Sequence, residues 1–69
     1  MKYGSIIRNI RESKGIKSSF VAKNLGMTVA GYRKIEVGEV DISMGKIEQI
    51  APLIGTTRND LFEEFKKAS

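Results

Sequence analysis

The sequence has neither cysteine nor histidine among its 69 residues, and each absence excludes a class of site. Without cysteine, neither a disulfide bond nor a thiolate zinc site can support the small core of so short a chain. Without histidine, the chain lacks the residue that most often serves as general base or metal ligand. No apolar run approaches the ~20 residues that span a bilayer. We therefore expect a small cytoplasmic domain that uses no metal or cofactor and is not an enzyme.

Basic residues are concentrated in the first half of the chain. Residues 1–38 contain eight lysine and arginine residues and two glutamates, whereas residues 39–69 contain four basic and six acidic residues. A basic half of this kind is typical of a surface that meets a polyanion. Charge alone leaves a second interpretation equally open, in which these side chains form an ordinary solvated surface.

Glycines divide the chain into five segments with helical periodicity. The glycines that mark predicted helix ends are Gly15, Gly26, Gly38 and Gly55. The residues placed to cap the last three helices are Thr28, Ser43 and Thr57. Pro52 falls inside the fourth segment and predicts a bend or a loosened last turn. No stretch alternates with the period of a strand, so we predict an all-α fold: a compact five-helix bundle in one domain, 1–66, with a frayed tail at 67–69.

The segment Ser18–Ile35 has the pattern of two helices joined by a tight turn. Ala22 is small enough for two helix backbones to approach where they cross, and Gly26 can adopt the left-handed turn that reverses the chain. Tyr32 and Ile35 are spaced to point inward from the second of these helices. The pattern resembles the helix-turn-helix of DNA-binding repressors, whose second helix lies in the major groove.

Five blocks in register extend this resemblance over residues 3–62. The blocks are Ile7-x-x-Ile10-Arg11-Glu12-x-Lys14-Gly15, Val21-Ala22-x-x-Leu25-Gly26, Ile35-Glu36-x-Gly38, Ile50-Ala51-x-x-Ile54-Gly55 and Asp60-Leu61-Phe62. In order and spacing the chain resembles the Cro/C1-type (XRE-like) helix-turn-helix family of phage and bacterial regulators. The resemblance implies a lambda-repressor-like DNA-binding domain. It also implies a sequence-specific transcription regulator, most often a repressor, that occupies a DNA operator in the bacterial cytoplasm and nucleoid.

The resemblance further implies that the third predicted helix carries the DNA-reading face. The predicted DNA-binding residues are Lys17, Ser18, Thr28, Val29, Ala30, Arg33 and Lys34. The family's base-reading positions are held here by Val29, Ala30 and Lys34. Val29 and Ala30 offer only apolar contact, which suits thymine methyl groups. Lys34 and Arg33 can reach guanine or phosphate, which predicts DNA binding of modest intrinsic specificity.

A protein-interaction module, antirepressor-like and with little base readout, is the alternative function. The small residues Val29, Ala30 and Gly31 form an apolar patch that suits a groove on another protein. Glu39 and Asp41 place negative charge after the third helix, where it repels phosphates. Salt distinguishes the two functions, since affinity for DNA falls steeply as salt rises and an apolar protein contact hardly responds.

The resemblance also implies a structural ion pair between Arg11 and Glu36. In this family an arginine of the first helix commonly pairs with a glutamate that ends the third, and the bond would hold the third helix on the scaffold. Two exposed charges would instead contribute only ~0–1 kcal/mol. We expect Arg11→Ala to lower thermal stability more than Lys14→Ala does.

Phe62 and Phe65, together with Leu61, crowd a short window of the last helix. This is more apolar surface than a terminal helix needs, and a homodimer interface would bury it. The resemblance agrees, because small repressors of this type usually pair about a two-fold axis on palindromic half-sites. In the alternative interpretation Leu61 and Phe62 close the core of the monomer, which leaves Phe65 as the interface residue.

Overall fold

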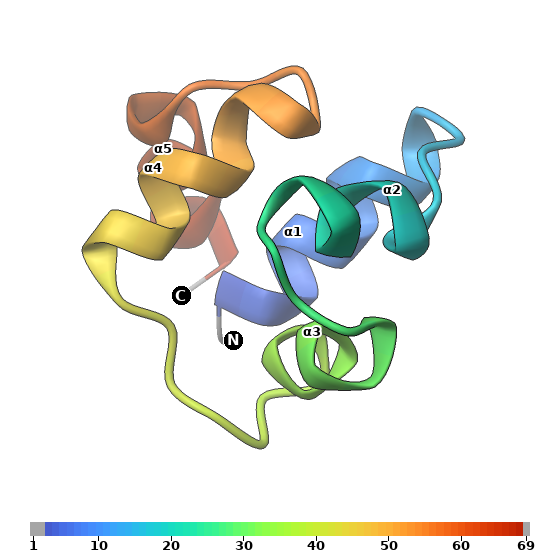
Figure 1. Cartoon of the computed structure of the whole chain (residues 1–69). Helices are drawn as coiled ribbons and strands as arrows, with labels where there is room; N and C mark the ends of the chain where they lie inside the picture. Colours follow the sequence, from blue (N-terminus) through green and yellow to red (C-terminus); the bar gives the residue numbers. More distant parts are fainter. Residues whose placement is uncertain (1–2, 69) are drawn as a thin grey trace.

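The computed structural model describes residues 3–68, in which five α-helices and no strand are present. The helices are α1 (Tyr3–Ser13), α2 (Ser18–Asn24), α3 (Val29–Glu36), α4 (Met44–Leu53) and α5 (Arg58–Ala68). Figure 1 shows α1 in the middle of the arrangement, with α2 and α3 on one side and α4 and α5 on the other. The predicted all-α fold is confirmed. Because α5 continues to Ala68, two residues of the predicted tail, 67–69, are helical, and the third lies outside the described residues.

Side-chain caps begin three of the helices at the predicted residues. The Thr28 hydroxyl accepts a hydrogen bond from the N–H of Gly31 at 3.0 Å. Ser43 and Thr57 each accept from the backbone N–H three residues later, at 3.1 Å. Each bond satisfies a donor that the first turn of a helix leaves without an intrahelical partner.

The four glycines that predicted helix ends all have positive φ angles in the structure. At Gly26, where φ is 70°, the chain reverses between α2 and α3. The N–H of Met27 donates to the carbonyl oxygen of Ala22 across this turn at 2.9 Å, which ends α2 and sets the direction of α3. A side chain at Gly26 would strain this conformation.

Pro52 lies in the last turn of α4, one residue before the helix ends. Beyond it the N–H of Ile54 is shared between the carbonyl oxygens of Ile50 and Ala51, at 3.3 and 3.2 Å. Shared bonds of this kind are common at helix ends. Because Pro52 has no N–H to donate to the carbonyl oxygen of Glu48, α4 loses one bond there and continues for only one more residue.

The core lies where the five helices meet. Its buried residues are Ile6, Ile7, Val21, Ala22, Tyr32, Ile47, Ile50, Ala51, Ile54 and Leu61. Tyr32 is the largest of the fully buried side chains and belongs to α3, so that helix is anchored through its inner face. None of the helices in residues 3–68 is long and apolar enough to cross a membrane.

Two contacts that join α1 to the rest of the molecule are not visible in the sequence pattern. A Cβ atom added at Gly4 would overlap the carbonyl oxygen of Ile35, so α1 and α3 cross at backbone contact there. At the other end of α1, the Lys14 ammonium donates to the carbonyl oxygens of Ile54 (2.9 Å) and Gly55 (2.7 Å). The second contact satisfies carbonyl groups that the end of α4 leaves free.

Candidate nucleic-acid interface

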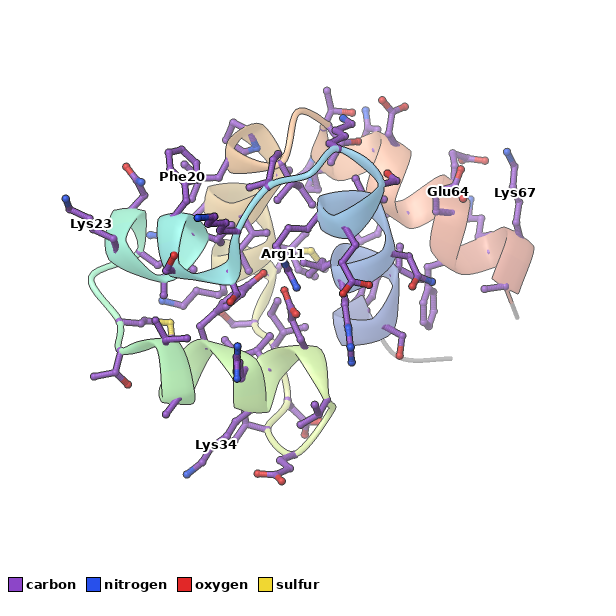
Figure 2. The ribbon with its side chains drawn as sticks, turned by 90° about the vertical axis from the view of Figure 1, so that its right-hand side faces the viewer. Arg11, Phe20, Lys23, Lys34, Glu64 and Lys67 are labelled. Carbon is purple, nitrogen blue, oxygen red and sulfur yellow. The ribbon has the colours of Figure 1, made fainter. Side chains whose placement is uncertain are left out.

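The two faces of α3 differ sharply in exposure. Tyr32 is fully buried and Ile35 is 5% exposed, as their spacing predicted. The opposite face is solvent-exposed and consists of Thr28, Val29, Ala30, Arg33 and Lys34. Figure 2 shows Lys34 extending from α3 away from the body of the molecule. The predicted DNA-reading residues of α3 therefore share one accessible face.

On the side of α3 that faces the core, the Arg11–Glu36 ion pair joins this helix to α1. Arg11 Nε donates to Glu36 Oε2 at 2.7 Å and Nη2 donates to Oε1 at 3.0 Å, a two-point contact. Arg11 Nη1 also donates to the carbonyl oxygen of Ile16 at 2.7 Å, which ties in the connection before α2. The two charged side chains are only 11% and 4% exposed. The guanidinium thus links α1, the α1–α2 connection and α3.

The Arg11 guanidinium stays charged in this contact. The hydrogen bond with Glu36 raises the pKa of Arg11 above its ordinary value. Charge-assisted two-point bonds of this type are among the stronger hydrogen bonds in proteins. The orientation of α3 is therefore set by a rigid contact, which suits a helix whose outer face must match another surface.

Ser18 and Arg33 are brought together by the fold, although they belong to different helices. Both line a hollow above the ion pair, with Arg8, Arg11, Glu12, Glu36 and Val37. Ser18 is partly buried, whereas Arg33 is exposed. Lys17 is also exposed, but it lines a separate groove with Phe20 on the side of α2 remote from this hollow. The predicted phosphate contacts thus follow α3 and the start of α2, and Lys17 lies at their margin.

Arg8 is a cation of this region that the sequence interpretation left out. Its side chain is about half exposed and lies 3.4 Å from Glu12 one turn later in α1. It borders the hollow that contains Ser18 and Arg33. The sequence does contain an indication of this position: Arg8 lies three residues before Arg11, so both fall on the same face of one helix.

Phe62 and Phe65, the predicted dimer residues, contact α1 of their own chain. The Phe65 ring stacks on Tyr3 with centroids 4.3 Å apart, and Phe62 meets Tyr3 edge-on at 5.8 Å. Both phenylalanines are half-buried, and Leu61 is fully buried. Part of the apolar surface that suggested a dimer is therefore used inside the monomer.

A comparison with protein families finds one match that covers most of the chain. The model of the family described as Helix-turn-helix matches residues 7–61. This range begins in α1, includes all of α2, α3 and α4, and ends at the buried Leu61 of α5. No curated protein matches the sequence. Within residues 3–68, no group of three or more acidic side chains is placed to hold a metal ion.

Proposed function

The chain belongs to the Cro/C1-type helix-turn-helix family of DNA-binding transcription regulators, and we propose that it docks α3 in the major groove of a DNA operator. The observation that carries this proposal is the arrangement of α3. Its inner face is anchored by Tyr32 and by the Arg11–Glu36 pair, while Arg33 and Lys34 extend into solvent. A rigid helix with cations on its free face suits a negatively charged groove.

Each side chain of the exposed face has a proposed role. Val29 and Ala30 contact thymine methyl groups, since neither can form a hydrogen bond to a base edge. Lys34 reads guanine, and Arg33 contacts either guanine or phosphate. Thr28, Ser18 and Lys17 contact the phosphate backbone, which positions α3 without reading sequence.

The protein is proposed to act as a repressor that binds as a two-fold dimer. Two copies would place their α3 helices in successive turns of a palindromic operator and exclude polymerase from it. Phe65, with Phe62 beside it, remains the proposed contact between copies. Its ring is half-buried on Tyr3, which leaves one part accessible to a second chain. Gene control of this kind takes place at the nucleoid, in the cytoplasm.

A fluorescence-anisotropy titration tests the reading face. The probe is a duplex selected for binding from a random library, and the variants are Arg33→Ala and Lys34→Ala. Each should weaken binding by about tenfold or more, because a base or phosphate contact is lost. Lys67→Ala is the control, since Lys67 lies at the opposite end of the molecule from α3 in Figure 2. Unchanged affinity in both α3 variants would contradict the assignment.

Binding to a protein partner is the second candidate function, and one feature favours it. Val29 is 36% exposed and has Ala30 and Gly31 beside it, so the centre of the free face is small and apolar. The acidic residues Glu39 and Asp41 are exposed in the connection that follows α3. A helix face of this kind can fit a groove on another protein.

A further inference from the structure

A second exposed surface lies on the side of α2 that is remote from α3. Six residues line a shallow, mostly apolar groove there: Ile16, Lys17, Ser19, Phe20, Lys23 and Leu53. Phe20 is 49% exposed, and in Figure 2 its ring extends from α2 on the side opposite α3. We call this surface the Phe20 groove. Apart from Lys17, its residues lie outside the face proposed to read DNA.

Two lysines flank the exposed ring. Lys17, Phe20 and Lys23 are spaced three residues apart, which places them along one side of α2. Both lysines are exposed, and neither takes part in the ion pairs found within residues 3–68. None of the six residues that line the groove is acidic. The groove therefore offers an apolar centre between two uncompensated positive charges.

The connection between α3 and α4 carries the complementary pattern. Val37 and Val40 are 59% and 45% exposed, although valine usually lies in the interior. Glu39 and Asp41 are exposed beside them, and the ion pairs of the described part of the chain include neither. We call residues 37–41 the acidic connection. It presents two apolar side chains next to two negative charges.

We propose that the acidic connection of one copy docks in the Phe20 groove of another copy of this chain. Figure 1 shows α2 and the segment between α3 and α4 at different sides of the molecule, so one chain cannot make this contact with itself. The other acidic apolar segment, 60–65, fits the groove less well because part of its apolar surface is already used within the chain. Leu61 within it is fully buried, and Phe65 stacks on Tyr3.

The contact joins two different patches, so it is head-to-tail. A two-fold interface instead pairs one patch with itself, and the surface around Phe65 can form such an interface at the same time. Only a few side chains take part on each side, which corresponds to a weak and transient association in free solution. Its opposite charges make the association sensitive to salt.

The contact between copies should also change the affinity for DNA, an inference that rests on the proposed operator binding. Glu39 and Asp41 follow α3 and repel phosphates near it. Lys23 of a neighbouring copy, which has no proposed contact with DNA, would offset these charges when the two copies occupy adjacent sites. Binding of one copy then raises the affinity for the next, so adjacent sites fill cooperatively.

A charge-swap experiment without DNA tests the contact. The groove variant carries Lys17→Glu and Lys23→Glu, and the connection variant carries Glu39→Lys and Asp41→Lys. Self-association of each is measured by sedimentation velocity over a concentration series. Each variant alone should associate at least about tenfold more weakly than the wild type, because like charges then face each other. An equimolar mixture of the two should recover wild-type association, because each variant offers the other a complementary surface.

Two further variants test whether self-association depends on the apolar centre of the groove and whether it responds to a charge change elsewhere on the surface. Phe20→Ala should weaken self-association about tenfold, since it removes the apolar centre of the groove. Lys67→Glu changes charge at the opposite end of the molecule and should leave association unchanged (Figure 2). Thermal melting followed by circular dichroism verifies that each variant is folded.

Three results would overturn the proposal. The first is a wild-type chain that does not associate across the concentration series. The second is charge variants that associate as strongly as the wild type, which assigns association to the two-fold surface. The third is a mixture that does not recover association, which shows that the lysines of the groove and the acidic residues of the connection do not face each other. Because no DNA is present, none of these results bears on the proposed operator binding, which the Arg33 and Lys34 variants test separately.

Discussion

At the scale of single residues, the position of α3 depends most on Arg11 and Glu36. Arg11→Ala would remove three hydrogen bonds and leave the Glu36 carboxylate, only 4% exposed, without its cation. An uncompensated buried charge costs several kcal/mol. We expect the free energy of unfolding, measured in urea, to fall by about 3 kcal/mol.

The structure shows that Lys14→Ala is not a suitable control for Arg11→Ala. The sequence suggested Lys14→Ala, but the Lys14 ammonium donates to two carbonyl groups and is therefore not an inert site. Arg8 is the better control, since its side chain is 52% exposed and its distance to Glu12 is 3.4 Å. Arg8→Ala should change stability by about 0.5 kcal/mol or less. Equal losses in the Arg11 and Arg8 variants would show that the buried pair does not stabilise the fold.

The raised pKa of Tyr32 predicts that the protein loses stability at alkaline pH. The Tyr32 hydroxyl is buried and has no hydrogen-bond partner within residues 3–68. Burial and the nearby Glu36 carboxylate raise its pKa above the ordinary value of about 10. A raised pKa means that the folded state holds the proton more tightly, so this contribution to stability is complete below pH ~10 and is lost as pH rises further.

Tyr32→Phe should remove this dependence. At neutral pH we expect the free energy of unfolding to change by about 1 kcal/mol or less, because phenylalanine keeps the buried ring and loses only the hydroxyl beside Glu36. Above pH ~10 the wild type should lose more stability than the variant. Urea unfolding at several pH values measures both effects. A parallel decline of the two proteins with pH would contradict the role of Tyr32.

At the scale of helices, the crossing of α1 and α3 depends on a glycine. A Cβ at Gly4 would overlap the Ile35 carbonyl oxygen and lie 2.8 Å from that of Glu36, and neither backbone atom can move away easily. Gly45 in α4 is the matched control, since nothing lies within 4 Å of a Cβ there. Gly4→Ala should lower the free energy of unfolding by about 2 kcal/mol or more.

Gly45→Ala should instead raise stability by about 0.5–1 kcal/mol, because alanine loses less conformational entropy in a helix. Thermal melts of the two variants measure the difference. Similar melting temperatures would mean that the helices can separate at Gly4 without cost. The same Gly→Ala substitution is expected to lower stability at Gly4 and to raise it at Gly45. Because helix propensity favours alanine at both positions, the difference reports the packing at Gly4.

At the scale of the whole molecule, salt distinguishes the two candidate functions. About four phosphate contacts per complex predict that affinity for the selected duplex falls about a hundredfold between about 50 and 200 mM salt. Lys17→Ala removes one proposed phosphate contact from each copy of the dimer and should reduce the slope of this dependence by about two. Anisotropy titrations at several salt concentrations give both values. An affinity that hardly changes with salt would favour the protein-interaction function.

The sequence alone was sufficient to predict the helices and to distinguish the buried face of α3 from its exposed face. Caps such as Thr28 and turns such as Gly26 act within a few residues, so they can be recognised locally. The period of 3.6 residues likewise separates Tyr32 and Ile35 from Arg33 and Lys34 without knowledge of the partner helix. The DNA-binding roles of the outer residues stay a prediction.

Contacts between distant parts of the chain were decided only by the tertiary structure. The partner of Lys14 lies 40 residues away, and the overlap at Gly4 involves a carbonyl group of another helix. The rings of Phe62 and Phe65, predicted to face a second copy, contact Tyr3 of their own chain. Helical periodicity indicates which side of a helix is apolar but not which residue will face it. That choice depends on how all five helices pack at once.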